Sequence, residues 1–111
     1  MEFPKPPSRK SEKRAQKAHR ASVIASVRRE VMRRDRYQCR CCAKYFTTLE
    51  MHEIVSRAQL RGKEPEEIFN TANCIALCRA CHRAITERRT QVTVINDTEG
   101  ANGRVQFNTL R

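Results

Sequence analysis

Two Cys-x-x-Cys pairs constrain this chain more than any other feature of its sequence: Cys39 with Cys42, and Cys78 with Cys81. Two such pairs at a distance from each other are typical of a tetrahedral zinc site that joins two segments. The sequence does not show the charged start and apolar run that are typical of a secretory leader. It also has no apolar stretch long enough to span a bilayer. We therefore expect a cytoplasmic protein without membrane contact, in which reduced thiols bind a metal rather than form disulfides.

The composition explains why a structural metal is needed. The chain has 111 residues, of which 39% are hydrophobic, 5% are aromatic and 32% are charged, with no tryptophan. A single small domain with so little apolar material gains little net stability from burial alone. A zinc ion held by four thiolates supplies about 10–16 kcal/mol of apparent binding free energy in small modules. We therefore predict structural Zn²⁺ at the four paired cysteines.

Two cysteines remain outside the pairs. Cys41 lies inside the first pair, and the pattern leaves it open as an alternative ligand to Cys42. Cys74 lies in a short apolar run and is expected to be a small buried hydrophobic residue.

The charge of the chain predicts a polyanionic partner. Lysine and arginine number 23 against 12 acidic residues, a net charge of +11. Residues 1–36 hold 12 basic and 4 acidic side chains, so this part carries most of the excess. A basic run alone is equally typical of a solvated, solubilising surface, but beside a metal motif it favours contact with nucleic acid.

The N-terminal third divides into two parts. Residues 1–10 contain three prolines and several cations, which predicts a flexible basic arm. From Ser11 to Asp35 there is no proline or glycine, and apolar residues recur at helical spacing from Val23 to Met32. This pattern predicts an amphipathic helix. Its other face carries candidate phosphate contacts: Arg28, Arg29, Arg33 and Arg34.

The rest of the chain alternates between short strands, loops and one helix. We predict a zinc knuckle over 37–46, a strand over 47–57 with Glu50 and His52 on one face, and a long loop over 58–71 with one helical turn. A helix is expected over 79–89, and a C-terminal β-hairpin over about 91–108 around a turn-rich loop.

These motifs together resemble one family. The elements are Arg34-Asp35-x-Tyr37-x-Cys39-x-x-Cys42, then a histidine in a short strand, then Asn73-x-x-x-Leu77-Cys78-x-x-Cys81-His82. Their order and spacing over residues 29–89 resemble the four-cysteine zinc subclass of HNH endonucleases. The resemblance implies an α+β, ββα-metal (His-Me finger) fold, with the core motif over 34–89 of a single domain spanning 11–111.

The resemblance also implies roles for individual residues. His82 takes the place of the metal ligand on the helix, and Asn73 that of the residue that orients the base. Where the family has a metal ligand followed by a histidine base, this chain has His52 followed by Glu53. We favour His52 and His82 as ligands of a catalytic divalent metal, Mg²⁺, Mn²⁺ or Ni²⁺, with Glu53 as base or water-orienting group. The alternative is His52 as the base, with Glu50 or Glu53 on the metal.

The implied function is metal-dependent hydrolysis of phosphodiester bonds in double-stranded DNA, by nicking or double-strand cleavage with low sequence specificity. Arg57 matches a basic position of the family and is expected to contact phosphate, the alternative being an ordinary exposed arginine. Small HNH proteins that resemble this one are often phage-encoded and act with terminases in DNA packaging, while others belong to restriction or mobile-element systems. We expect a monomer. The competing interpretation is a non-catalytic zinc module that binds nucleic acid, or an accessory subunit.

Overall fold

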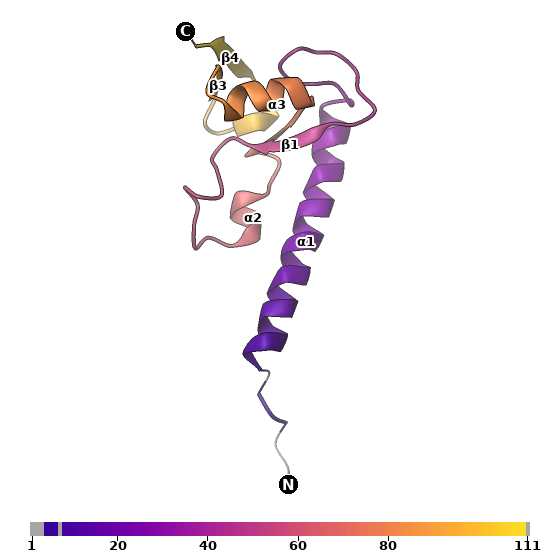
Figure 1. The fold of residues 1–111 in the computed structure, drawn as a ribbon, viewed down its shortest axis with the longest axis vertical. Helices are drawn as coiled ribbons and strands as arrows, with labels where there is room; N and C mark the ends of the chain where they lie inside the picture. The colour runs from indigo at the N-terminus through magenta and orange to yellow at the C-terminus, as the bar shows by residue number, and fades with distance from the viewer. Residues whose placement is uncertain (1–3, 7, 111) are drawn as a thin grey trace.

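A long N-terminal helix carries a small zinc-finger-like body at its C-terminal end. The computed structural model describes residues 4–6 and 8–110. Helix α1 spans Arg9–Arg34, and the body gathers around its C-terminal half, while its first turns extend well beyond (Figure 1). The molecule therefore measures 66 × 27 × 27 Å.

Local signals explain where α1 begins and ends. The Ser8 side chain caps the helix by accepting a hydrogen bond from the Ser11 N–H at 3.1 Å. The helix stops at Asp35, because Arg36 and Tyr37 both adopt left-handed backbone angles, with φ of 56° and 57°. The predicted helix over 11–35 is confirmed with an earlier start, so Arg9 and Lys10 belong to the helix. Of the expected arm, residues 1–3 and 7 lie outside the described part of the chain.

The central unit is a β-hairpin followed by a helix. Strand β1 (Glu50–Glu53) pairs antiparallel with β2 (Cys74–Leu77), with His52 opposite Ile75 and Glu50 opposite Leu77. Helix α3 (Arg79–Thr86) follows β2 directly. This is the predicted ββα arrangement, with a shorter first strand than the expected 47–57. Between β1 and β2 the loop contains one short helix, α2 (Pro65–Ile68).

A second hairpin closes the chain. Strands β3 (Thr90–Val94) and β4 (Val105–Thr109) pair antiparallel, and the turn-rich segment between them holds a short 3₁₀ helix, η1 (Gly100–Asn102). β3 packs against α3, and the Ala101 N–H donates to the Ala72 carbonyl at 2.7 Å. The predicted C-terminal hairpin is confirmed. No helix among the described residues has both the length and the apolar character needed to cross a membrane.

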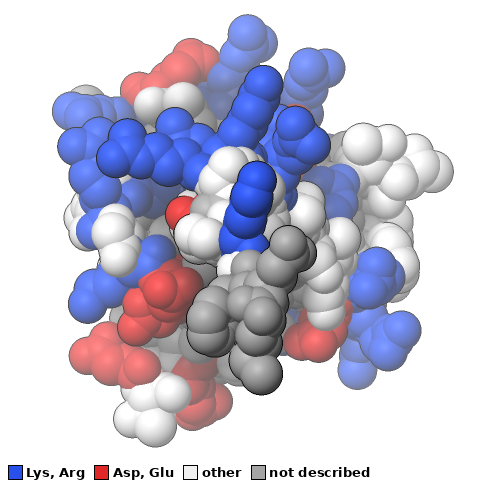
Figure 2. All heavy atoms as spheres, turned by 90° about the horizontal axis from the view of Figure 1, so that it is seen from below, with Lys and Arg blue, Asp and Glu red and all other residues white. Residues whose placement is uncertain are grey.

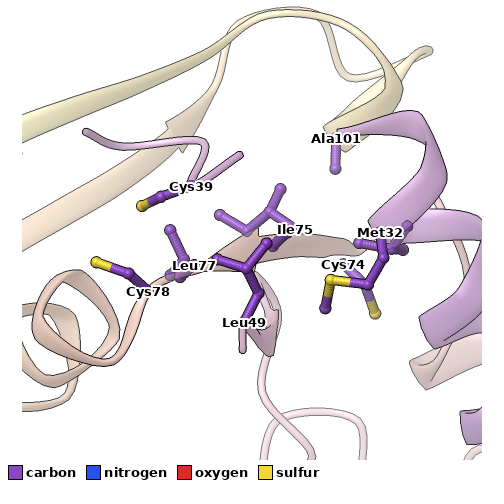
Figure 3. Packing of buried hydrophobic residues seen from close by; sticks show 10 residues of the cluster. Met32, Cys39, Leu49, Cys74, Ile75, Leu77, Cys78 and Ala101 are labelled. Atoms are coloured by element: carbon purple, nitrogen blue, oxygen red, sulfur yellow. The ribbon is translucent and has the colours of Figure 1, made fainter. Parts of the chain in front are cut away.

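The core lies between α1 and β2. Every residue of β2 is buried, and Ile75 and Leu77 pack against Val31 and Met32 of α1 and against Leu49 (Figure 3). Cys74 is fully buried in this cluster, as expected. The core is small, and the side chains of Cys39 and Cys78 form one edge of it.

A buried carboxylate ties α1 to the rest of the core. Asp35, only 7% exposed, accepts hydrogen bonds from the Ala76 N–H of β2 at 2.9 Å and from Arg40 at 3.0 Å. Arg34 binds both of its oxygens, at 2.8 and 3.0 Å. Arg34 and Arg40 then reach backbone carbonyls of the β1–β2 loop, β2 and η1: Thr71, Cys74, Ala101 and, just beyond η1, Gly103.

We predict that Asp35→Ala lowers the free energy of unfolding by about 3–5 kcal/mol, because two guanidinium groups lose a buried partner. Urea denaturation of the zinc-loaded protein measures this change. The control is Glu87→Gln, which removes an exposed carboxylate paired with Arg83 and Arg89 and should cost no more than about 1 kcal/mol. Equal stability of Asp35→Ala and the wild type would contradict the structural role of Asp35.

Candidate metal and nuclease site

Four cysteine sulfurs from two segments meet at one point. Cys39 and Cys42 follow α1 in a knuckle closed by a bridge between Gln38 and Tyr45, and Cys78 and Cys81 begin α3. All four Sγ atoms lie within 4.8 Å of one another. Sulfurs arranged tetrahedrally around zinc at about 2.3 Å are about 3.8 Å apart, so the cluster has the size of a zinc site.

The chemistry of these sulfurs also requires a cation. Burial and the neighbouring sulfurs of Cys78 and Cys39 raise the pKa of Cys81 far above its ordinary value. The Cys39 thiol is also buried, but backbone N–H groups of Cys42, Cys78 and Cys41 outweigh this burial and lower its pKa. Four thiolates so close together cannot all be ionised without a positive charge between them. The cluster therefore fits a zinc ion, and Figure 3 shows the buried Cys39 and Cys78 with their sulfurs turned to the same side.

Cys41 lies beside the cluster without being part of it. Its thiol is within hydrogen-bonding reach of Cys81, and burial raises its pKa. The geometry thus brings Cys42, rather than Cys41, into the set of four. Of the two alternatives that the sequence pattern leaves open, this arrangement favours Cys42.

We predict one bound zinc per chain in the wild type and in Cys41→Ser, and loss of zinc in Cys42→Ser and Cys81→Ser. The reason is that serine at a ligand position leaves only three thiolates, whereas Cys41 supplies none of the four. Metal analysis of purified protein measures the content, and thermal unfolding with and without a chelator measures the dependence of the fold on the metal. Loss of zinc in Cys41→Ser with retention in Cys42→Ser would reverse the assignment.

A second group of side chains lies between β1 and α3. The His82 ring of α3 contacts Glu50 through Nδ1 and Oε1 at 2.8 Å, and the His52 ring meets it edge to face with centroids 5.1 Å apart. Alternation along β1 places Glu50 and His52 on the same side of the strand. The hairpin and the helix thus bring Glu50, His52 and His82 together.

The surroundings of His52 favour a neutral ring. Burial lowers its pKa below the ordinary value, the charge of His82 lowers it further, and the charge of Glu53 works in the opposite direction. A neutral imidazole has the lone pair that a metal ligand or a general base needs. Among the described residues, however, the four cysteines form the only group of three or more potential ligands so closely spaced.

Glu53 and Arg57 form a pair of their own. Arg57 Nε donates to Glu53 Oε1 at 2.7 Å, and the Arg57 guanidinium lies over the buried Phe69 ring at 5.0 Å. Arg20 of α1 lies over the same ring at 5.5 Å. Because neighbours on a strand point to opposite faces, the Glu53 carboxylate leaves β1 on the side away from His52.

Asn73 holds the chain that leaves β1. Its side-chain oxygen accepts a hydrogen bond from the Val55 N–H at 2.8 Å, and its amide group donates to the carbonyls of Val55 and Ile68 at 3.0 and 2.8 Å. The Ile54 N–H donates to the Asn73 carbonyl. These are the backbone contacts that an orienting asparagine needs.

Two arginines beside His82 were not predicted from the sequence. Arg79 and Arg83 line an open hollow of about 460 Å³ together with Glu50, His82 and Thr86. They lie three and one positions from His82, and a helix places residues three apart on the same face. That spacing is the sequence signal that would have indicated Arg79.

The arginines predicted to contact phosphate occupy different surroundings. Arg29 and Arg33 are exposed on α1, and Arg28 is exposed but donates to the Leu49 carbonyl at 2.8 Å. Arg34 differs, because its guanidinium is bound to Asp35, to carbonyls of Thr71 and Cys74 and to the side chain of Asn102. These contacts bind the Arg34 guanidinium within the framework of the fold, which argues against the expected phosphate contact.

Comparison with known families agrees with this architecture. The family model described as HNH endonuclease matches residues 39–88, which include both cysteine pairs, the hairpin and α3. This segment belongs to the HNH endonuclease family, and its four-cysteine cluster fits the zinc subclass. Searches of the curated proteins and of the solved structures give no match. An HNH domain indicates a nuclease or another function related to nucleic acids.

Proposed function

We propose that the protein is a divalent-metal-dependent endonuclease that hydrolyses phosphodiester bonds of double-stranded DNA with low sequence specificity. The observation that carries the proposal is the meeting of Glu50, His52 and His82 between β1 and α3 of the HNH segment. A link to phage packaging proteins such as terminase, and a monomeric state, stay predictions from the family resemblance.

Two imidazoles supply the ligands for the metal in this proposal. His82 engages Glu50 through Nδ1, which leaves Nε2 for the ion, and a carboxylate behind a histidine is a common way of orienting a metal ligand. His52 is the second ligand. Nitrogen donors suit Mn²⁺ and Ni²⁺ better than Mg²⁺, which prefers oxygen. When bound, the divalent ion supplies positive charge for the phosphate and for the leaving 3′ oxygen.

The protein must also accept a proton from the attacking water. Glu53 is our first candidate, with Arg57 holding its carboxylate in place. The second assignment makes His52 the base and lets Glu50 bind the metal with His82. The opposite orientation of Glu53 on β1 favours it, whereas the lowered pKa of His52 is compatible with both assignments. Arg79 and Arg83 are placed to neutralise the phosphate in both assignments.

We predict metal-dependent nicking of supercoiled plasmid by the wild type with Mn²⁺, Ni²⁺ or Mg²⁺, and none with EDTA. His82→Ala should remove the activity without unfolding the protein, because His82 lies outside the cysteine cluster. Glu53→Gln should slow cleavage by about 10²–10⁴-fold if Glu53 is the base. His19→Ala is the matched control, because His19 pairs with Glu66 far along α1 and should leave cleavage unchanged.

Absence of cleavage with every metal, in protein that retains zinc and binds DNA, would support the non-catalytic binding module instead. Cleavage by His82→Ala at the wild-type rate would exclude this site as the nuclease centre.

Binding of Mn²⁺, followed by electron paramagnetic resonance in the zinc-loaded protein, separates the two assignments. We predict that His52→Ala loses both Mn²⁺ binding and cleavage, because His52 is a ligand in the first assignment. The first assignment is wrong if His52→Ala keeps Mn²⁺ binding but loses cleavage, and Glu50→Gln loses both.

A further inference from the structure

One side of α1 carries cations and neither of the acidic residues of the helix. Lys10, Arg14, Lys17 and Arg28 recur at intervals that fall on one side of a helix, and all four are exposed. The two acidic residues of the helix, Glu12 and Glu30, are about five turns apart and share the opposite side. We call the side with Lys10, Arg14, Lys17 and Arg28 the cationic face.

The first turns of this face have no neighbouring element. At its C-terminal end Arg28 donates to the Leu49 carbonyl at 2.8 Å, and Lys17 borders a hollow that Glu64 and Pro65 also line. Helix α2 and its loop approach α1 from another side, where Glu66 pairs with His19 and the Phe69 ring lies against Arg20. His19 and Lys17 lie on opposite sides of the helix, because two residues turn it by about 200°. Figure 1 shows the first turns of α1 extending past α2 with no other element beside them.

Figure 2 shows the molecule along α1 from its N-terminal end. Many lysine and arginine side chains gather on the upper side of this view, whereas most acidic side chains lie below and to the left. Three exposed acids, Glu64, Glu66 and Glu67, belong to the α2 segment, and Glu66 pairs with His19.

The composition of the cationic face identifies its partner. Between the cations lie Ala18, Ala21 and Ala25, which are small and exposed, so that nothing bulky separates the helix from a flat or grooved surface. The edge of this face carries one large apolar side chain, the half-buried Ile24, which is too little apolar surface to insert into a membrane or a protein groove. From Lys10 to Arg28 the helix rises about 27 Å, which matches roughly eight base pairs of duplex at about 3.4 Å each.

We propose that the cationic face of α1 lies along the phosphate backbone of double-stranded DNA beside the segment held at the HNH site. This inference rests on the proposed function, because it takes the substrate to be duplex DNA. It extends the interface by three residues that the sequence pattern did not single out, Lys10, Arg14 and Lys17, and omits Arg34. Contacts of this kind carry affinity rather than sequence preference.

We predict that the triple variant Lys10→Gln, Arg14→Gln, Lys17→Gln binds a 30-base-pair duplex with a reduced dependence on salt. Each phosphate contact contributes about 0.9 to the slope of log K against log salt, so the slope should fall by about 2 to 3. Fluorescence anisotropy over a range of salt concentrations measures the binding. Every protein carries His82→Ala to prevent cleavage, and EDTA is omitted so that zinc stays in the cysteine cluster. Glutamine preserves helix propensity, and circular dichroism checks it.

The control removes the same charge from elsewhere: Arg61→Gln, Lys63→Gln, Arg104→Gln, three exposed residues outside α1. We expect this control to keep most of the wild-type slope. An unchanged slope in the α1 variant, or equal reductions in both variants, would overturn the proposal. Because binding is measured in an inactive background, failure here leaves the plasmid assay of the proposed nuclease unaffected, and a protein that does not cleave can still show the α1 effect.

Discussion

The buried carboxylate of Asp35 is the contact on which the arrangement of this small protein depends. The carboxylate accepts a hydrogen bond from the backbone of β2 and binds the guanidinium groups of Arg34 and Arg40. These two arginines also donate to carbonyls of the β1–β2 loop and of η1. A carboxylate with low exposure is costly to bury, and its cost is offset only when every oxygen has partners of suitable geometry. Segments that are far apart in the sequence are therefore oriented by one side chain, in a domain whose apolar core is too small to orient them alone.

The metal cluster and the candidate nuclease site share one helix. Cys78 caps α3, Cys81 lies in its first turn, and His82 follows immediately. The orientation of His82 toward β1 thus depends on where the cysteine cluster holds the start of α3. The cysteine cluster and the candidate nuclease site therefore share the first turns of one short helix.

Elements with a strong local pattern could be predicted from the sequence, and contacts between distant side chains could not. The cysteine pairs, α1 and the C-terminal hairpin follow from spacing and alternation, and the structure agrees with them. The central ββα unit follows instead from the family resemblance. Arg34 was assigned to the surface because it lies among exposed arginines, but its position at the last turn of α1 carries it against Asp35 and the loop before β2. Such a distinction requires knowledge of where the helix ends relative to β2.

The candidate site shows the same division. Alternation on β1 predicts that Glu50 and His52 share a face, but the contact of Glu50 with His82 depends on the angle between β1 and α3. The positions of Arg79 and Arg83 in the hollow depend on the same angle. The contacts of Arg57 with Glu53 and with Phe69 both depend on the turn that follows β1, because no helix joins these residues.

The Phe69 ring lies between α1 and the segment that follows β1. Arg20 from α1 and Arg57 from the end of β1 both lie over this one buried ring, and Arg57 also holds Glu53. The orientation of the long helix and the position of the Glu53 carboxylate therefore share one packing contact, the face of a single aromatic ring.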